Sequence, residues 1–315
     1  MSRLTACLAW LVLLAAGCGG ARGSSAAERA VGADLTAVAS VFPLAWVAEQ
    51  VAPEARMRLL NEGSQAAHDI ELSPDQRAAV ESAQVVLYMG DIGYQPQVEQ
   101  AAGAANGQVV DVAEIAGDAR LLRSGGDPHD REGEEHAGEE GAIDPHIWFD
   151  AEVMADVALR TGEAFARADP DGAGAYTDNA QDLAARLTTV DRELDELLGG
   201  DCEFDEAVVS HTAYAYLVEP RGKEIHGIAG IDPEAGASGG ELADLVTEVR
   251  DEGFRHVLAE PVEGRRDAEA LAAEAGVELL EISPLDTVTA EQAGAGFTDL
   301  TREQAQTFAT AYGCP

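Results

Sequence analysis

The chain has 315 residues, of which 58 are acidic and 20 are basic, so its formal net charge at pH 7 is −38. This charge disfavours binding to nucleic acid or to an anionic membrane surface, because both are negative themselves. It suits solubility at high ionic strength and raises the local concentration of cations. After the N-terminal segment, no apolar run reaches the length of a membrane helix.

The N-terminus has the pattern of a lipoprotein signal. Arg3 precedes the apolar run "LTACLAWLVLLAA", and "LAAGC" ends in small residues and a cysteine. We expect residues 1–18 to be the signal peptide, with Cys18 lipidated, and residues 19–35 to be a flexible tether. Ala15 stands where such signals usually carry Leu, so an ordinary secretory signal is the alternative. The protein would then lie outside the cytoplasm and meet the membrane only through a lipid anchor.

The cysteines predict one disulfide. Cys7 leaves with the signal and Cys18 carries the lipid, which leaves Cys202 and Cys314 in an oxidising compartment. We predict a bond between these two residues, with two unpaired thiols as the alternative.

Residues 36–174 are predicted to form a first α/β lobe. "DLTAVASVFPLAWVAEQVA" is a β-branched apolar run followed by a helical pattern, and the strand "AQVVLYMG" follows the helical "SPDQRAAVESA". "NGQVVDVAE" adds a short strand. Alternation of this kind predicts a parallel sheet with helices on both faces.

One long helix is predicted over residues 175–199. From Ala175 to Gly199 there is no Gly or Pro between the ends, and at about 1.5 Å per residue the helix is roughly 36 Å long. Its apolar positions recur every three or four residues, at Ala180, Leu183, Leu187, Val190, Leu194 and Leu197. Such a helix can join two lobes.

Residues 200–315 repeat the alternation of strands and helices, in "EAVVSH", "SGGELADLVTEVRDEG", "HVLAE", "RDAEALAAEAG", "VELLEI" and "TREQAQTFATAYG". We therefore expect an α/β protein of two lobes with a cleft between them. In open α/β sheets, ligands bind at the carboxyl ends of strands. The polar residues at such positions are His68 in "AAHDIELSP", His146 in "DPHIWFD", His211 at the end of "EAVVSH", and Asp286 after "VELLEI".

The stretches "AAHDIELSP", "DPHIWFD", "YTDNAQDLAARLTTVDREL", "SHTAYAYL" and "LAEP" occur in one order over residues 36–314. Together they resemble the metal-binding solute-binding proteins of ABC importers, which deliver zinc or manganese to bacterial permeases. The resemblance implies two α/β lobes joined by a rigid helix, with the metal in the interlobe cleft. By motif, His68 and His146 match family ligands, and His211 stands where zinc-type members carry His and manganese-type members usually carry Glu.

The fourth ligand is less well defined by the resemblance. "SPLD" resembles a variant with an acid after Pro-Leu, which favours Asp286, whereas others carry Asp where this chain has Ser283. Glu281 and a water molecule are the alternatives. Glu260, after the strand "HVLAE", is expected to hydrogen-bond a ligand imidazole from outside the coordination sphere.

Three imidazoles with one carboxylate form a borderline-soft site that suits zinc, whereas manganese prefers more oxygen ligands. Affinity alone does not exclude copper or nickel. If all four ligands are protein groups, no position is left for a reacting water, so we expect a carrier and not an enzyme. The expected function is a monomeric zinc receptor that serves an ABC permease and its ATPase. A manganese receptor, a hydrolase, and an adhesin or metal buffer are the alternatives.

The other histidines have weaker interpretations. His129 and His136 lie in an acidic, Gly-rich segment, residues 124–142, which is expected to be a disordered loop that acts as a secondary metal trap or is simply solvated. His226 and His256 lack a ligand motif and are interpreted as structural.

A hydrolase finds little support in the sequence. There is no "HExxH" motif. "GASGG" matches the letters of a nucleophile elbow but does not follow a strand, so Ser238 is interpreted as the first residue of a helix.

Overall fold

The computed structural model describes residues 34–61, 67–68, 70–123, 141–233, 236–261 and 264–315. The predicted signal, the predicted lipidation site Cys18, and the loop histidines His129 and His136 lie outside these residues. Among the described helices, none combines the length and the apolar character that crossing a membrane requires.

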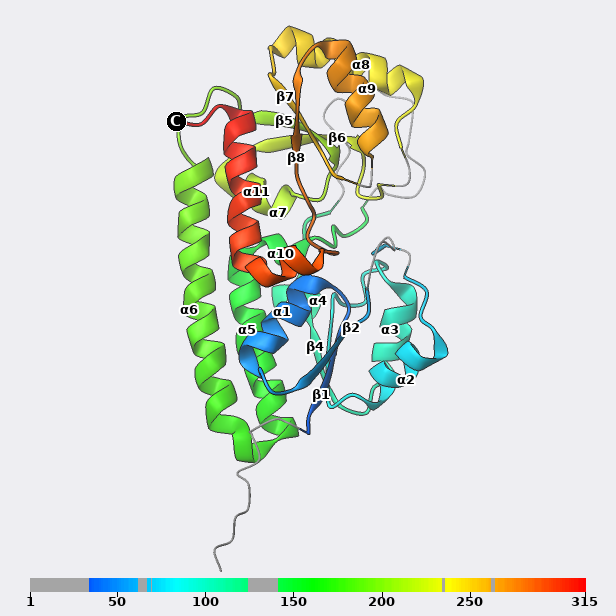
Figure 1. Ribbon diagram of the computed structural model, residues 1–315, viewed down its shortest axis with the longest axis vertical. Helices are drawn as coiled ribbons and strands as arrows, with labels where there is room; N and C mark the ends of the chain where they lie inside the picture. The colour runs from blue at the N-terminus through cyan, green and yellow to red at the C-terminus, as the bar shows by residue number, and fades with distance from the viewer. Residues whose placement is uncertain (1–33, 62–66, 69, 124–140, 234–235, 262–263) are drawn as a thin grey trace, which may run out of the picture. The chain divides into compact units, whose positions relative to one another are not determined.

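The first lobe is built on a four-stranded parallel sheet with the order β2-β1-β3-β4 (Figure 1). Its strands are β1 (Thr36–Ala39), β2 (Arg56–Leu59), β3 (Val85–Tyr88) and β4 (Gln108–Asp111). Its helices are α1 (Phe42–Val51), α2 (Pro74–Ser82), α3 (Pro96–Ala102), α4 (Val112–Ala116), the 3-10 turn η1 (Ile147–Phe149) and α5 (Ala151–Ala168). Val86 packs with α2 and α3, and its neighbour Leu87 packs with α1 and α5, so helices cover both faces of the sheet.

The second lobe repeats this plan with a parallel sheet of order β6-β5-β7-β8. Its strands are β5 (Glu206–His211), β6 (Glu224–Ala229), β7 (His256–Ala259) and β8 (Glu278–Glu281). Its helices are α7 (Ala215–Val218), the 3-10 turn η3 (Glu219–Arg221), α8 (Gly239–Glu252), α9 (Arg265–Ala275), α10 (Ala290–Ala295) and α11 (Phe297–Tyr312). Ser238 caps α8 and accepts a hydrogen bond from the backbone of Glu241, so it begins a helix as predicted.

A short 3-10 turn, η2 (Pro170–Gly172), leads into the long helix α6 (Ala173–Leu198). The helix begins two residues earlier and ends one residue earlier than predicted. It packs beside α5 and α11 (Figure 1). Contact with α5 is close enough to require a glycine, because a Cβ at Gly162 would lie 2.6 Å from Cβ of Ala180.

Polar contacts join α6 to both lobes. Nη2 of Arg186 donates to Oε1 of Gln50 in α1 over 3.1 Å. At the other end, the buried guanidinium of Arg221 in η3 lies 2.6 Å from Oδ1 of Asp191. The helix is thus attached to a first-lobe helix and to a second-lobe turn.

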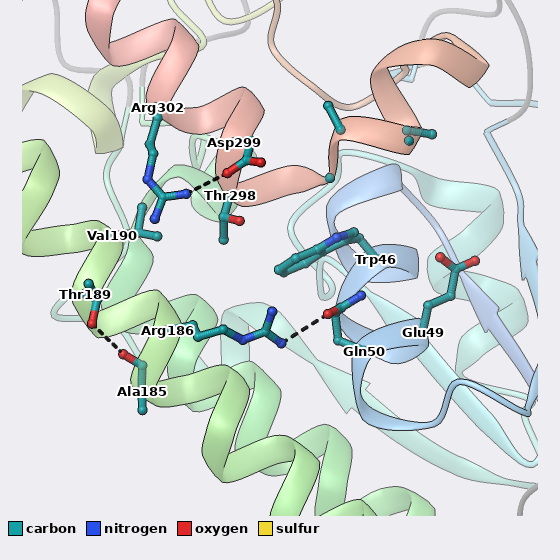
Figure 2. A pocket seen from close by; sticks show the side chains of 14 residues that line it. Trp46, Glu49, Gln50, Ala185, Arg186, Thr189, Val190, Thr298, Asp299 and Arg302 are labelled. Atoms are coloured by element: carbon teal, nitrogen blue, oxygen red, sulfur yellow. Dashed lines mark hydrogen bonds and ion pairs between the residues drawn. The ribbon is translucent and has the colours of Figure 1, made fainter.

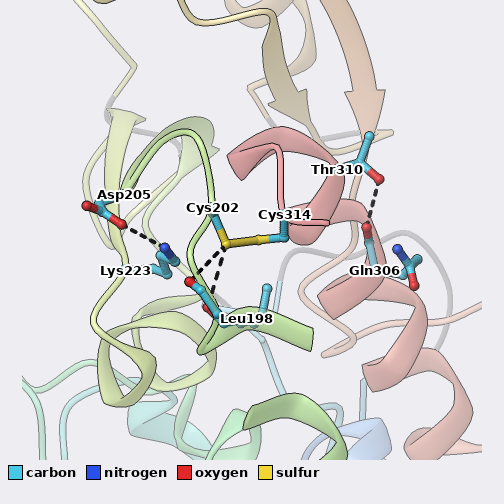
Figure 3. The surroundings of a disulfide bond; sticks show 8 residues. Leu198, Cys202, Asp205, Lys223, Gln306, Thr310 and Cys314 are labelled. Atoms are coloured by element: carbon cyan, nitrogen blue, oxygen red, sulfur yellow. Dashed lines mark hydrogen bonds and ion pairs between the residues drawn. A yellow bond between two sulfur atoms is a disulfide. The ribbon is translucent and has the colours of Figure 1, made fainter. Parts of the chain in front are cut away.

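Cys202 and Cys314 form the predicted disulfide (Figure 3). The bond joins the segment after α6 to the segment after α11. Beside it, the backbone N–H of Phe204 donates to the carbonyl of Tyr312 over 2.9 Å, so the two segments are also paired through the backbone.

Candidate functional site

The structure brings together the three histidines that the sequence singles out. His68 lies between β2 and α2, His146 directly precedes η1, and His211 is the last residue of β5. One donor nitrogen of each ring lies within 4.8 Å of the others, and the ring centroids are 5.3 to 6.3 Å apart. Two of the rings come from the first lobe and one from the second, so the cluster lies between the lobes.

The backbone before His68 is held by a side chain from another loop. Nε2 of the buried Gln95 donates to the carbonyl of Ala67 over 2.8 Å, and the ring of Tyr94 meets the imidazole of His68 edge-on at 4.8 Å. Burial, with the nearby imidazoles of His146 and His211, lowers the pKa of His68 to about 2. The His68 ring is therefore neutral at physiological pH.

His146 is fully buried and is oriented by Asp144. Oδ1 of Asp144 accepts from the backbone N–H of His146 over 2.9 Å and lies 2.7 Å from its Nδ1. Burial lowers the pKa of His146, although the neighbouring carboxylate acts in the opposite direction. With Nδ1 held by Asp144, the lone pair of Nε2 is available to a metal ion. Among the described residues, neither this Nε2 nor that of His68 has a hydrogen-bond partner, although both atoms are buried.

Glu260 lies beside the imidazole of His211. Oε1 of Glu260 lies 2.7 Å from Nδ1 of His211 and also accepts from the hydroxyl of Tyr214 over 2.9 Å. Glu260 directly follows β7, and β7 lies beside β5 in the sheet. The two side chains thus meet at the carboxyl edge of the sheet, where the connections diverge in opposite directions and where open α/β sheets bind ligands.

The loop after β8 places Asp286 near the first lobe. Nε1 of Trp148, in the same segment as His146, donates to the carbonyl of Pro284 over 2.8 Å. The backbone N–H of Phe42 donates to the carbonyl of Asp286 over 3.2 Å. Between these contacts the buried Leu285 has φ +64°, a left-handed conformation that costs a non-glycine residue about 1–2 kcal/mol. Hydrogen bonds from Trp148 and Phe42 hold this turn against the first lobe.

The two carboxylates considered as a fourth ligand differ in their surroundings. Asp286 is buried, and its Oδ1 accepts from the backbone N–H of Thr287 over 2.6 Å. Glu281 is exposed and lies 3.3 Å from Arg265. The group of donor atoms within 4.8 Å of one another contains only the three histidines among the described residues, so coordination by Asp286 stays a prediction.

Tyr216 is a further residue near the site that was not among the predicted site residues. Its hydroxyl accepts from the backbone N–H of Leu122 over 2.9 Å and donates to the carbonyl of Asp144 over 3.2 Å. Arg123 and Ile143 form an antiparallel bridge beside it. The two ends of the acidic loop are therefore joined to each other and held by α7. The tyrosine lies in the motif "SHTAYAYL", but its partners are more than 70 positions away.

A separate cavity of about 740 Å³ lies between α1, α6 and the α10–α11 segment (Figure 2). Trp46, Arg186 and Arg302 line it, and no histidine is among its lining residues. It therefore does not belong to the histidine cluster.

The donor set suits a borderline-soft divalent ion. Three imidazoles, of which those of His68 and His146 are neutral through a lowered pKa, offer nitrogen ligands without first releasing protons. The model of the family described as zinc-uptake complex component A, periplasmic, matches residues 37–311. The chain belongs to this family.

Known relatives agree with this assignment. The high-affinity zinc uptake system protein ZnuA of Bacillus subtilis is 24% identical over 92% of this chain and 91% of its own length. The zinc-binding lipoprotein AdcA of Streptococcus pneumoniae is 26% identical over 83% of this chain, which spans only 52% of that protein. The periplasmic zinc-binding protein TroA of Treponema pallidum shares the fold, with a TM-score of 0.75 and 17% identity over 89% of this chain and 99% of TroA.

Membership of the zinc-uptake component A family makes the chain a binding protein of a transport system and not an enzyme. The two-lobe architecture predicted from the sequence is confirmed by the two sheets and by the shared fold.

Proposed function

We propose that the chain captures Zn²⁺ outside the cytoplasm and delivers it to an ABC permease, whose ATPase drives uptake. The observation that carries this proposal is the cluster of His68, His146 and His211, in which two buried Nε2 atoms have no hydrogen-bond partner among the described residues. Leaving buried polar atoms unsatisfied costs about 1–3 kcal/mol each, and a bound metal ion removes that cost.

Zinc is favoured over manganese by the donor set. Nitrogen ligands suit zinc, and manganese prefers a site richer in oxygen. Asp144 and Glu260 hold the Nδ1 sides of His146 and His211, which makes these rings better donors. We propose Asp286 as the fourth ligand, because it is buried in a loop that contacts the His146 segment, whereas Glu281 is exposed.

Release would follow from separation of the two lobes. Because the ligands come from both lobes, a small displacement takes one imidazole away from the other two. Polar contacts hold the fourth-ligand loop to the first lobe, among them the bond from Asn61 to the hydroxyl of Thr287, 2.6 Å long. We propose that docking to the permease breaks such contacts.

Residues 1–18 would act as a signal with Cys18 lipidated, and the protein would lie as a monomer on the outer face of the cell membrane. The loop histidines His129 and His136 would bind metal only weakly.

A competitive titration tests the proposed function. Chelator-treated protein is titrated with Zn²⁺ in the presence and absence of excess Mn²⁺, and zinc should bind one tight site that manganese does not occupy. His146→Ala should weaken this event by orders of magnitude, while His256→Ala, outside the cluster, should leave it unchanged. Equal competition by manganese would reject zinc selectivity, and tight binding by the His146 variant would remove this residue from the site.

A further inference from the structure

A second cluster of metal-ligating side chains lies in the second lobe. Glu206, His226 and Glu248 each offer one donor atom, and these atoms lie within 4.8 Å of one another. Glu206 is the first residue of β5 and His211 is the last. At about 3.3 Å per residue, the two clusters are roughly 16 Å apart along the strand. The second cluster therefore lies at the amino edge of the sheet, away from the interlobe histidines.

Strand register and one helix bring these three side chains together. In the parallel pair β5 and β6, Val208 lies opposite His226, and Glu206 lies on the same face because side chains two positions apart share a face. Helix α8 covers this face, since its Val246 packs in one apolar cluster with Val208. Glu248, from the same helix, reaches the imidazole of His226.

The two carboxylates lie near different nitrogens of the His226 ring and at different distances from them. Oε1 of Glu248 lies 2.5 Å from Nδ1 of His226, which is hydrogen-bond distance, and Oε2 of Glu206 lies 3.7 Å from Nε2. Ligand atoms at about 2.0–2.1 Å from a tetrahedral zinc ion are about 3.3 Å apart, so the longer distance is close to the span that a metal ion bridges. A carboxylate on Nδ1 with the metal on Nε2 is a recurrent arrangement for histidine ligands.

The solvent exposure and the negative charge of this cluster suit a bound cation. His226 is 6% exposed, while the side chain of Glu206 is 38% exposed, so an ion can reach the cluster from the solvent side. Two carboxylates around one imidazole also create a negative local potential.

We propose that Nε2 of His226 and the carboxylate of Glu206 form an auxiliary site for zinc or a similar borderline divalent cation, with Glu248 as a positioning residue and water completing the coordination. A site with two protein ligands should bind the cation more weakly than the site formed by the three interlobe histidines. The site does not depend on the acidic loop or on transport.

Calorimetric zinc titration of a His129→Gln/His136→Gln background tests the site, because this background removes the loop histidines. Two binding events are expected, a tight one and a weaker one. Glu206→Gln and His226→Gln should abolish the weaker event, and Glu248→Gln should weaken it by about 10-fold to 100-fold. The tight event should be unchanged in all three variants.

His256 and Glu278 provide a matched control. They are the first residues of the paired strands β7 and β8, with 4.0 Å between Nε2 and Oε2, and they belong to no such three-residue group among the described residues. His256→Gln and Glu278→Gln should keep both events.

A single event in the background, or a weaker event that persists in Glu206→Gln, would overturn the proposal and leave a structural ion pair. If the variant of the buried His226 fails to fold, the variant of the partly exposed Glu206 still tests whether the auxiliary site exists.

Discussion

The carboxylate of Glu260 lies beside the imidazole of His211, with 2.7 Å between Oε1 and Nδ1, which leaves Nε2 of the ring for the proposed metal ion. The hydroxyl of Tyr214 donates to the same oxygen, so the carboxylate is held as well. The ring orientation of this proposed ligand thus depends on two residues outside the proposed coordination sphere.

Glu260→Gln should weaken zinc binding by about 10-fold to 100-fold, because an amide is a poorer partner for Nδ1–H than a carboxylate. Glu281→Gln is the matched control, since Glu281 ends the neighbouring strand β8 and is exposed. Calorimetry on both variants measures the effect. Unchanged affinity in the Glu260 variant would show that the ion pair does not tune the site, and a loss in the Glu281 variant would revive that residue as a ligand.

Replacing residues 124–140 by Asn-Gly should leave tight zinc binding within about twofold of the original. The reason is structural, because Arg123 and Ile143 already pair in an antiparallel bridge, and the shortened connection is a common hairpin length. Zinc titration and thermal unfolding check this. A large loss of tight binding in a folded variant would place a ligand within the loop.

Tyr216→Phe should destabilise the protein by about 1–3 kcal/mol, because the backbone N–H of Leu122 loses its acceptor. It should also weaken zinc binding, since the backbone of Asp144 loses a contact that positions His146. Tyr312→Phe removes one bond to a backbone carbonyl within the second lobe and is the control. Urea unfolding and zinc titration separate the two effects, and equal zinc affinity in both variants would contradict a positioning role for Tyr216.

The metal-free protein should lose stability as the pH falls below about 6.5. The native pKa of His68 is lowered to about 2, so in the window between these values the unfolded chain binds a proton that the native chain does not. Each such histidine lowers the free energy of unfolding by up to about 1.4 kcal/mol per pH unit, and above pH 6.5 the contribution is absent.

Urea unfolding of chelator-treated protein at pH 7.5 and pH 5.0 measures this dependence. His68→Gln should reduce the loss between the two pH values by about 2 kcal/mol. An unaltered pH dependence in the His68 variant would mean that this ring is not the group responsible.

Local sequence patterns determined much of the molecule. Apolar periodicity predicts the strands and α6, because the spacing of apolar residues within one segment indicates which side of that segment is buried. The motifs around His68, His146 and His211 indicated the proposed ligands, and the predicted extracytoplasmic location indicated that Cys202 pairs with Cys314.

Only the tertiary structure showed contacts between residues that lie far apart in the chain. The contact of Tyr216 with Leu122 joins residues 94 positions apart, and Glu206, His226 and Glu248 meet because β5 lies beside β6 under α8. Strand order and helix packing bring these residues together. The periodicity of a single segment does not predict such contacts. A histidine interpreted as structural from its sequence thus lies between two carboxylates, since its neighbours are set by the sheet and not by the chain.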